Sequence, residues 1–177
     1  MEAVRHEVEV DVRIAKKYED YVLAVNVFRN ELKTTAFIIG AYRDASLTEC
    51  VDTLEARKDG MSAGAVARSE RYIRSTEEAR ERVEAANAAL IEADKEYEGW
   101  TRFFLVPGGH IHSTRSCSSC NKRGAITSFS WLPELSGLTE ADAVTAHGSV
   151  LCTVCFPSAP VEWTTDKAPK SARKVGA

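Results

Sequence analysis

The 177-residue sequence contains no long hydrophobic run. The longest apolar stretch, residues 36–42, is followed by Arg43, whereas a transmembrane helix needs about 18 or more consecutive apolar residues. The first six residues, MEAVRH, also lack the apolar core of a secretory signal. These absences exclude a membrane-spanning protein and predict a cytoplasmic one.

The chain also has little net charge, because 23 basic and 26 acidic residues leave a formal charge of −3. This balance argues against a protein that covers nucleic acid with most of its surface. The sequence lacks a phosphate-binding glycine loop and any recognisable nucleophile motif, so an enzyme is not the favoured class.

Charge and composition divide the chain into three predicted parts. Residues 1–98 hold 15 basic and 21 acidic residues, are rich in alanine, and predict a helical hairpin or bundle. Residues 99–165 hold four of each sign, together with four of the five cysteines, and predict a small metal-binding α+β domain. Residues 166–177 carry a net charge of +3 and predict a flexible basic tail.

Helical periodicity dominates the first part. Apolar residues recur at alternating spacings of four and three, which places them on one helix face. They are Ile14, Tyr18, Tyr21, Val25, Phe28 and Leu32, and the same spacing reaches Thr35, Ile39 and Tyr42. Val8 to Ile14 also alternate with charged residues as in a strand, but no partner strand is evident, so we expect the helix to start near Asp11.

Two further helices are expected before residue 99. Ser46 with Glu49 forms a capping-box pattern, which predicts a helix over residues 47–58. A longer helix over residues 62–98 carries a seam in which alanines alternate with larger residues such as Tyr72 and Leu90. Two long seams with a short connection favour an antiparallel, coiled-coil-like hairpin, and a parallel homodimer is the alternative.

The strongest chemical signal is the spacing of the last four cysteines. Cys117 and Cys120 form one C-x2-C pair, and Cys152 and Cys155 form another after 31 intervening residues. Two residues between thiols allow a tight turn to direct both at one ion, and four thiolates give zinc a closed tetrahedral shell. The spacing therefore predicts one structural zinc ion, while Cys50 is expected to be a small buried hydrophobic residue.

Around these pairs the sequence predicts short strands at residues 102–106, 110–112 and 125–131, and a helix at residues 139–147. Together with the preceding helices this is an α+β protein, with a second domain similar in form to a zinc ribbon or treble clef. His110 and His112 lie on the same side of the second strand. They can hydrogen-bond locally, ligate metal in place of a cysteine, or act in catalysis, and the sequence leaves these alternatives open.

The motifs themselves resemble a group of small zinc-finger-like proteins from actinobacteria, their phages and their plasmids. The resemblance covers about residues 100–165 and rests on GHIHS, the first cysteine pair, WLPELSG and LCTVCFPSAPVEW. It implies a metal site and a mobile genetic element or its bacterial host as the setting.

Three functions follow as hypotheses. The first is a zinc-stabilised module that binds a host or phage protein, with Trp131, Phe156 and Trp163 either anchoring the interface or covering the zinc core. The second is nucleic-acid binding through the basic tail and a row of arginines at three-residue spacing, Arg68, Arg71 and Arg74. The third is an enzyme that uses His110 and His112.

Overall fold

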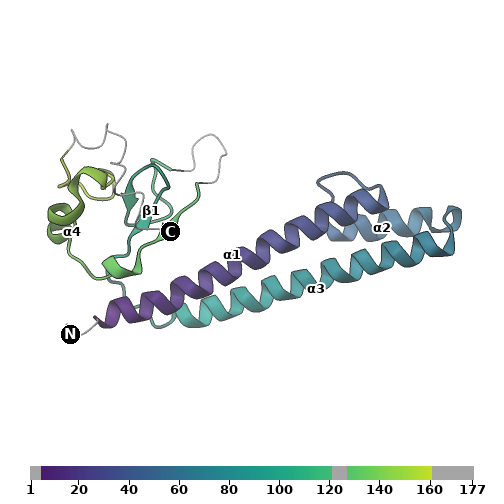
Figure 1. Cartoon of the computed structure of the whole chain (residues 1–177), viewed down its shortest axis with the longest axis horizontal. Helices are drawn as coiled ribbons and strands as arrows, with labels where there is room; N and C mark the ends of the chain where they lie inside the picture. Colours follow the sequence, from purple (N-terminus) through teal and green to yellow (C-terminus); the bar gives the residue numbers. More distant parts are fainter. Residues whose placement is uncertain (1–4, 121–126, 161–177) are drawn as a thin grey trace. The chain divides into compact units, whose positions relative to one another are not determined.

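A computed structural model describes residues 5–120 and 127–160 of the chain (Figure 1). It divides into two compact units, which we describe separately. The helical unit comprises residues 16–95, and the C-terminal unit combines residues 1–15 with residues 96–177. The expected tail at residues 166–177 lies outside the described residues. The mixed class, with long N-terminal helices and a small antiparallel sheet, is confirmed.

The helical unit is built from α1 (His6–Ile39), α2 (Leu47–Arg57), the 3-10 turn η1 (Lys58–Gly60) and α3 (Ala63–Asp94). Within it, α1 and α3 lie side by side (Figure 1). One core cluster joins the end of α1 to α2, and Cys50 at its centre is fully buried, as predicted. The members of that cluster are Ala36, Ile39, Ala45, Cys50 and Leu54.

A buried pair of hydroxyls fixes the contact between α1 and α3. Thr35 and Thr76 are both 0% exposed, and their Oγ1 atoms lie 2.7 Å apart. The Thr35 hydroxyl also lies 3.2 Å from the Tyr72 carbonyl oxygen, to which it donates. Such small polar side chains allow close packing of two helices, but only at the register where each hydroxyl finds a partner.

The first two helix starts differ in how well the sequence predicted them. The capping box of α2 is present, with the Glu49 backbone NH donating to Ser46 Oγ and the Ser46 NH donating to the Glu49 carboxylate. The expected start of α1 near Asp11 is wrong, because the helix begins at His6. Val10 and Ile14, four residues apart, form one buried helical face, so packing overrides the alternating pattern.

The helix ends also differ from expectation. α1 ends at Ile39, where Gly40 adopts a φ of 76° and Arg57 donates to the Ile39 carbonyl at 2.7 Å. Tyr42 therefore lies beyond the helix and is 91% exposed, instead of continuing the buried face. The helix expected over residues 62–98 also ends earlier than predicted, since α3 ends at Asp94. None of the described helices is long and apolar enough to cross a membrane.

The C-terminal unit contains a small antiparallel sheet of three strands in the order β2-β1-β3. These are β1 (Phe104–Leu105), β2 (Ile111–His112) and β3 (Ser130–Trp131). Two 3-10 turns, η3 (Pro133–Leu135) and η4 (Gly148–Val150), flank α4 (Glu140–His147). A core cluster fills the space between sheet and helix, and it contains Phe103, Ile111, Leu132, Ala143, Val150, Leu151, Phe156 and Ala159.

A buried carboxylate holds the first turns of α1 to the rest of this unit. Asp11 is 0% exposed, and its oxygens accept hydrogen bonds from Trp100 Nε1 at 2.8 Å and Ser136 Oγ at 2.6 Å. Arg102 donates to it from Nε at 2.9 Å and forms an ion pair with it, in which Nη2 lies 2.9 Å from the same carboxylate oxygen. The guanidinium also lies 3.5 Å from the centre of the Tyr97 ring. A buried charge is tolerated when it is paired and hydrogen-bonded in this way.

Replacement of Asp11 by alanine should therefore destabilise the C-terminal unit by about 3–5 kcal/mol, because it leaves the Arg102 guanidinium buried without its carboxylate. The measurement is urea unfolding followed by tryptophan fluorescence, which reports on this unit because all three tryptophans lie within residues 96–177. Glu9→Ala, an exposed change on the same helix, is the control and should have little effect. A loss below about 1 kcal/mol for Asp11→Ala would contradict the assignment.

Candidate metal centre

Each cysteine pair forms a tight turn closed by a backbone hydrogen bond. The Cys120 NH donates to the Cys117 carbonyl at 2.9 Å, and the Cys155 NH donates to the Cys152 carbonyl at 3.0 Å. The Phe156 NH also donates to the Cys152 carbonyl, at 2.8 Å. Turns of this kind direct the two thiols of a C-x2-C pair toward one side.

The sheet brings the second turn next to β2. Ile111 forms a parallel bridge with Leu151, and the Cys152 NH donates to the Ile111 carbonyl at 2.9 Å. His112 follows Ile111 directly and is 3% exposed. The fold thus places the second cysteine turn beside His112, although the two lie more than 35 positions apart in the sequence.

Four side chains form what we call the donor cluster: His112, Cys117, Cys152 and Cys155. Their ligand atoms all lie within 4.8 Å of one another. Cys117 Sγ lies 3.9 Å from Cys152 Sγ, and Cys155 Sγ lies 3.7 Å from His112 Nδ1. Around a tetrahedral zinc ion two sulfurs are about 3.8 Å apart, and a sulfur and a nitrogen about 3.6 Å. The donors are therefore close enough to hold one metal ion.

The structure brings together three of the four cysteines predicted as ligands, and it places the fourth beside them. Cys120 Sγ lies 3.5 Å from His112 Nε2 and 3.9 Å from its Nδ1, but Cys120 is not part of the donor cluster. Cys120 is half-buried, as is Cys155 of the donor cluster, whereas Cys117 and Cys152 are each 5% exposed. Of the two histidines, His112 lies in the cluster and His110 does not.

The pKa shifts within the donor cluster favour the metal-binding forms of His112 and Cys117 but not that of Cys155. Burial, followed by the neighbouring His110, lowers the pKa of His112, so the imidazole is held in the neutral form that ligates metals. Burial alone would raise the pKa of the Cys117 thiol, but hydrogen bonds from the Ser119 side chain and backbone outweigh it and lower that pKa. The pKa of Cys155 is raised, chiefly by burial.

The aromatic residues suggested as interface anchors have different positions. Phe156 is 1% exposed and stacks on Phe103 with ring centroids 5.5 Å apart, so its proposed role at an interface is wrong and it belongs to the core. Trp131 is half-buried, with its ring near the Arg102 guanidinium and Phe104. Trp163 lies outside the described residues.

The sequence does not single out two important residues. It leaves three roles open for His112, although a position five residues before Cys117, at the end of a strand, favours a ligand. Asp11 is expected only as the start of a helix. Its position between the apolar residues Val10 and Ile14 is the signal that it is a buried acid.

Comparison with known proteins identifies no relative of this chain. No family model matches it, and neither the curated proteins nor the solved structures give a significant match. Any inference about its function must therefore come from its own residues.

Single substitutions should show which of these side chains ligate the metal. We expect Cys117→Ser and His112→Ala each to lower metal affinity more than tenfold, because each removes one member of the donor cluster. Cys120→Ser should keep about one metal ion per chain, as should the matched control Cys50→Ser, which removes a thiol in the other unit. The measurement is Co²⁺ titration followed by visible absorption, with elemental analysis of the purified variants. Equal losses in Cys117→Ser and Cys120→Ser would instead favour the four-cysteine shell.

Proposed function

We propose that this protein is a zinc-stabilised protein-interaction module. The observation that carries the proposal is the donor cluster, in which three thiols and one imidazole converge within 4.8 Å. Sulfur and nitrogen donors in a four-coordinate set are typical of zinc. The zinc-ribbon or treble-clef form expected of the C-terminal unit is consistent with two C-x2-C turns beside a small sheet.

A zinc ion in this position would be structural. Four protein donors complete a tetrahedral shell and leave no coordination position open for a substrate, and three of them, His112, Cys117 and Cys152, are no more than 5% exposed. The ion would join β2 to both cysteine turns. That link would stabilise a unit whose strands have only two residues each.

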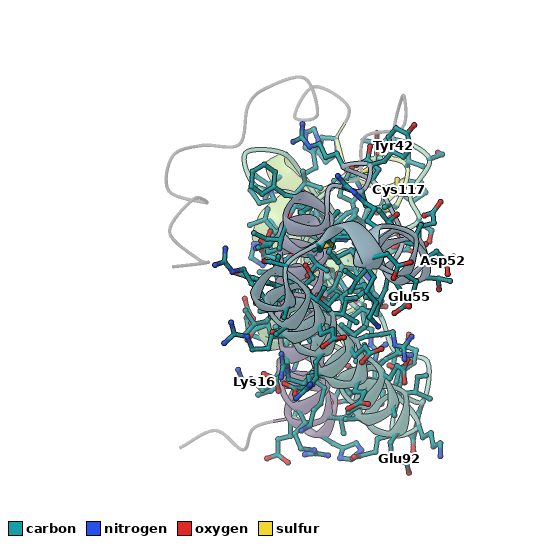
Figure 2. All side chains as sticks on the ribbon, turned by 90° about the vertical axis from the view of Figure 1, so that its right-hand side faces the viewer. Lys16, Tyr42, Asp52, Glu55, Glu92 and Cys117 are labelled. Atoms are coloured by element: carbon teal, nitrogen blue, oxygen red, sulfur yellow. The ribbon has the colours of Figure 1, made fainter. Side chains whose placement is uncertain are left out.

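The interaction role is supported by the surface of the helical unit. Its large hydrophobic side chains with the highest exposure are Tyr42 at 91%, Phe37 at 83% and Leu23 at 65%. Tyr42 and the exposed acidic residues Asp52 and Glu55 lie on the right-hand side of the view in Figure 2. Exposed large apolar side chains are candidates for a protein-binding site. A phage or mobile-element setting, with a host or phage protein as partner, rests on the resemblance of the motifs.

Removal of the metal should unfold the C-terminal unit selectively. We expect a strong chelator to extract about one zinc ion per chain and to change tryptophan fluorescence to that of an exposed side chain. Most of the far-UV circular dichroism of the helices should remain, because the core of the helical unit contains none of the donors. Readdition of zinc should restore the fluorescence. A purified native protein without metal would disprove the structural role.

The interaction role and the nucleic-acid hypothesis differ in their dependence on salt. We expect the purified protein to pass a DNA column at low ionic strength, since the row Arg68, Arg71 and Arg74 on α3 has acidic neighbours at Glu70, Glu77 and Glu78. The triple change Arg68→Ala, Arg71→Ala and Arg74→Ala serves as the matched variant. Salt-dependent retention that this variant abolishes would transfer the function to nucleic-acid binding.

A further inference from the structure

The donor cluster fills the four positions around a tetrahedral zinc ion and leaves one neighbouring thiol over. That thiol belongs to Cys120. Its Sγ lies 3.5 Å from Nε2 and 3.9 Å from Nδ1 of His112, although Cys120 is outside the cluster. Cys120 therefore contacts a ligand without having a place in the metal shell, and its chemistry is not determined by the ion.

We propose that Cys120 is a site of reversible oxidation by peroxides, and that its oxidation releases the zinc ion by forming a disulfide with Cys117. The proposal rests on the zinc site proposed above and concerns the regulation of that site. Disulfides in reducing compartments are usually transient and serve catalysis or redox sensing, which is the role assigned here.

The geometry of the first cysteine turn permits this disulfide. Cys117 and Cys120 are the two ends of the turn, which is closed by the 2.9 Å hydrogen bond from the Cys120 NH to the Cys117 carbonyl. A four-residue turn brings its end Cα atoms within about 7 Å, and disulfides join Cα atoms up to about 6.8 Å apart. The Ser119 hydroxyl lies 3.1 Å from Cys117 Sγ and 4.0 Å from Cys120 Sγ, so both sulfurs lie around one group. The bond therefore requires no movement of another segment.

The second turn has the same spacing but differs in its ligands. Cys152 and Cys155 both belong to the donor cluster, so a bound ion engages both sulfurs. Cys155 is half-buried, as is Cys120, so access to solvent does not distinguish the two turns. Ligation does, because the first turn has one thiol that the ion binds and one that it does not.

The reaction has two steps. In the first, the O–O bond of the peroxide breaks, one oxygen binds the Cys120 sulfur as a sulfenic acid, and the other leaves as water or an alcohol. In the second, the Cys117 thiolate attacks the Cys120 sulfur, the S–S bond forms, and the S–O bond breaks with loss of hydroxide. The two sulfurs together give two electrons to the peroxide.

The consequence for the metal follows from the number of donors. Once Cys117 is in a disulfide, three members of the donor cluster remain, so the affinity for zinc falls and the ion is released. Reduction of the disulfide by a dithiol restores the fourth donor. Burial raises the pKa of the Cys120 thiol, and only the thiolate reacts with peroxide, so we expect oxidation to be slow.

Zinc release from the full-length zinc-loaded protein tests the proposal. Hydrogen peroxide at about 1 mM should release about one zinc ion per chain within minutes to hours, as followed with a zinc-binding dye. A dithiol with added zinc should reverse the change. Trypsin cleavage after Arg115 and Lys122 gives residues 116–122, which contain both cysteines of the first turn. The mass of this peptide should fall by about 2 Da, the loss of two hydrogens, while the peptide with the second turn keeps its mass.

Variants identify the thiol that starts the reaction. Cys120→Ser keeps the donor cluster, and it should slow zinc release about tenfold or more. Cys50→Ser, the matched control, removes a thiol outside the cluster and should release zinc as the unchanged protein does.

Three results would overturn the proposal. They are zinc release at an unchanged rate in Cys120→Ser, a peptide over residues 116–122 of unchanged mass after release, and a disulfide between Cys152 and Cys155 instead. A zinc-loaded protein that keeps its ion in peroxide would also overturn it, while leaving the structural zinc site in place. A native protein that contains no zinc would disprove the zinc site itself.

Discussion

The convergence of three thiols and one imidazole in a single, largely buried cluster is the constraint on which the C-terminal unit depends. Donors this close are repulsive when deprotonated, and costly to bury, unless an ion balances them. The sheet register, the bridge from Ile111 to Leu151 and the two closed turns all serve to bring the donors together. Strands of two residues give little stability by themselves, so the cluster and the hydrophobic core around Phe103 and Phe156 support each other.

A second buried charge works differently in the same unit. Asp11 receives hydrogen bonds from Trp100, Arg102 and Ser136, so its charge is balanced entirely by protein groups. It fixes the first turns of α1 against the strand region, and it positions the Arg102 guanidinium between Tyr97 and Trp131. The C-terminal unit thus contains one cluster that suits a metal ion and one buried ion pair, Asp11 with Arg102, whose charges balance each other.

A pair of buried hydroxyls determines how the two long helices of the helical unit pack. The Thr35 and Thr76 hydroxyls select one register for these helices, because any shift would leave them buried without partners. The register therefore depends on one polar contact in an otherwise apolar interface.

The sequence by itself determined the features that depend on short spacings. The capping pairs of α2 and α4 follow from residues three positions apart, and the two C-x2-C turns follow from four-residue motifs. Only the tertiary structure showed that His112 lies in the donor cluster while Cys120 lies beside it, and that Phe156 lies in the core. Each of these depends on which distant segments meet, and local periodicity carries no information about such contacts. For the same reason Tyr42, which continued the apolar spacing of α1, lies on the surface once Gly40 ends the helix.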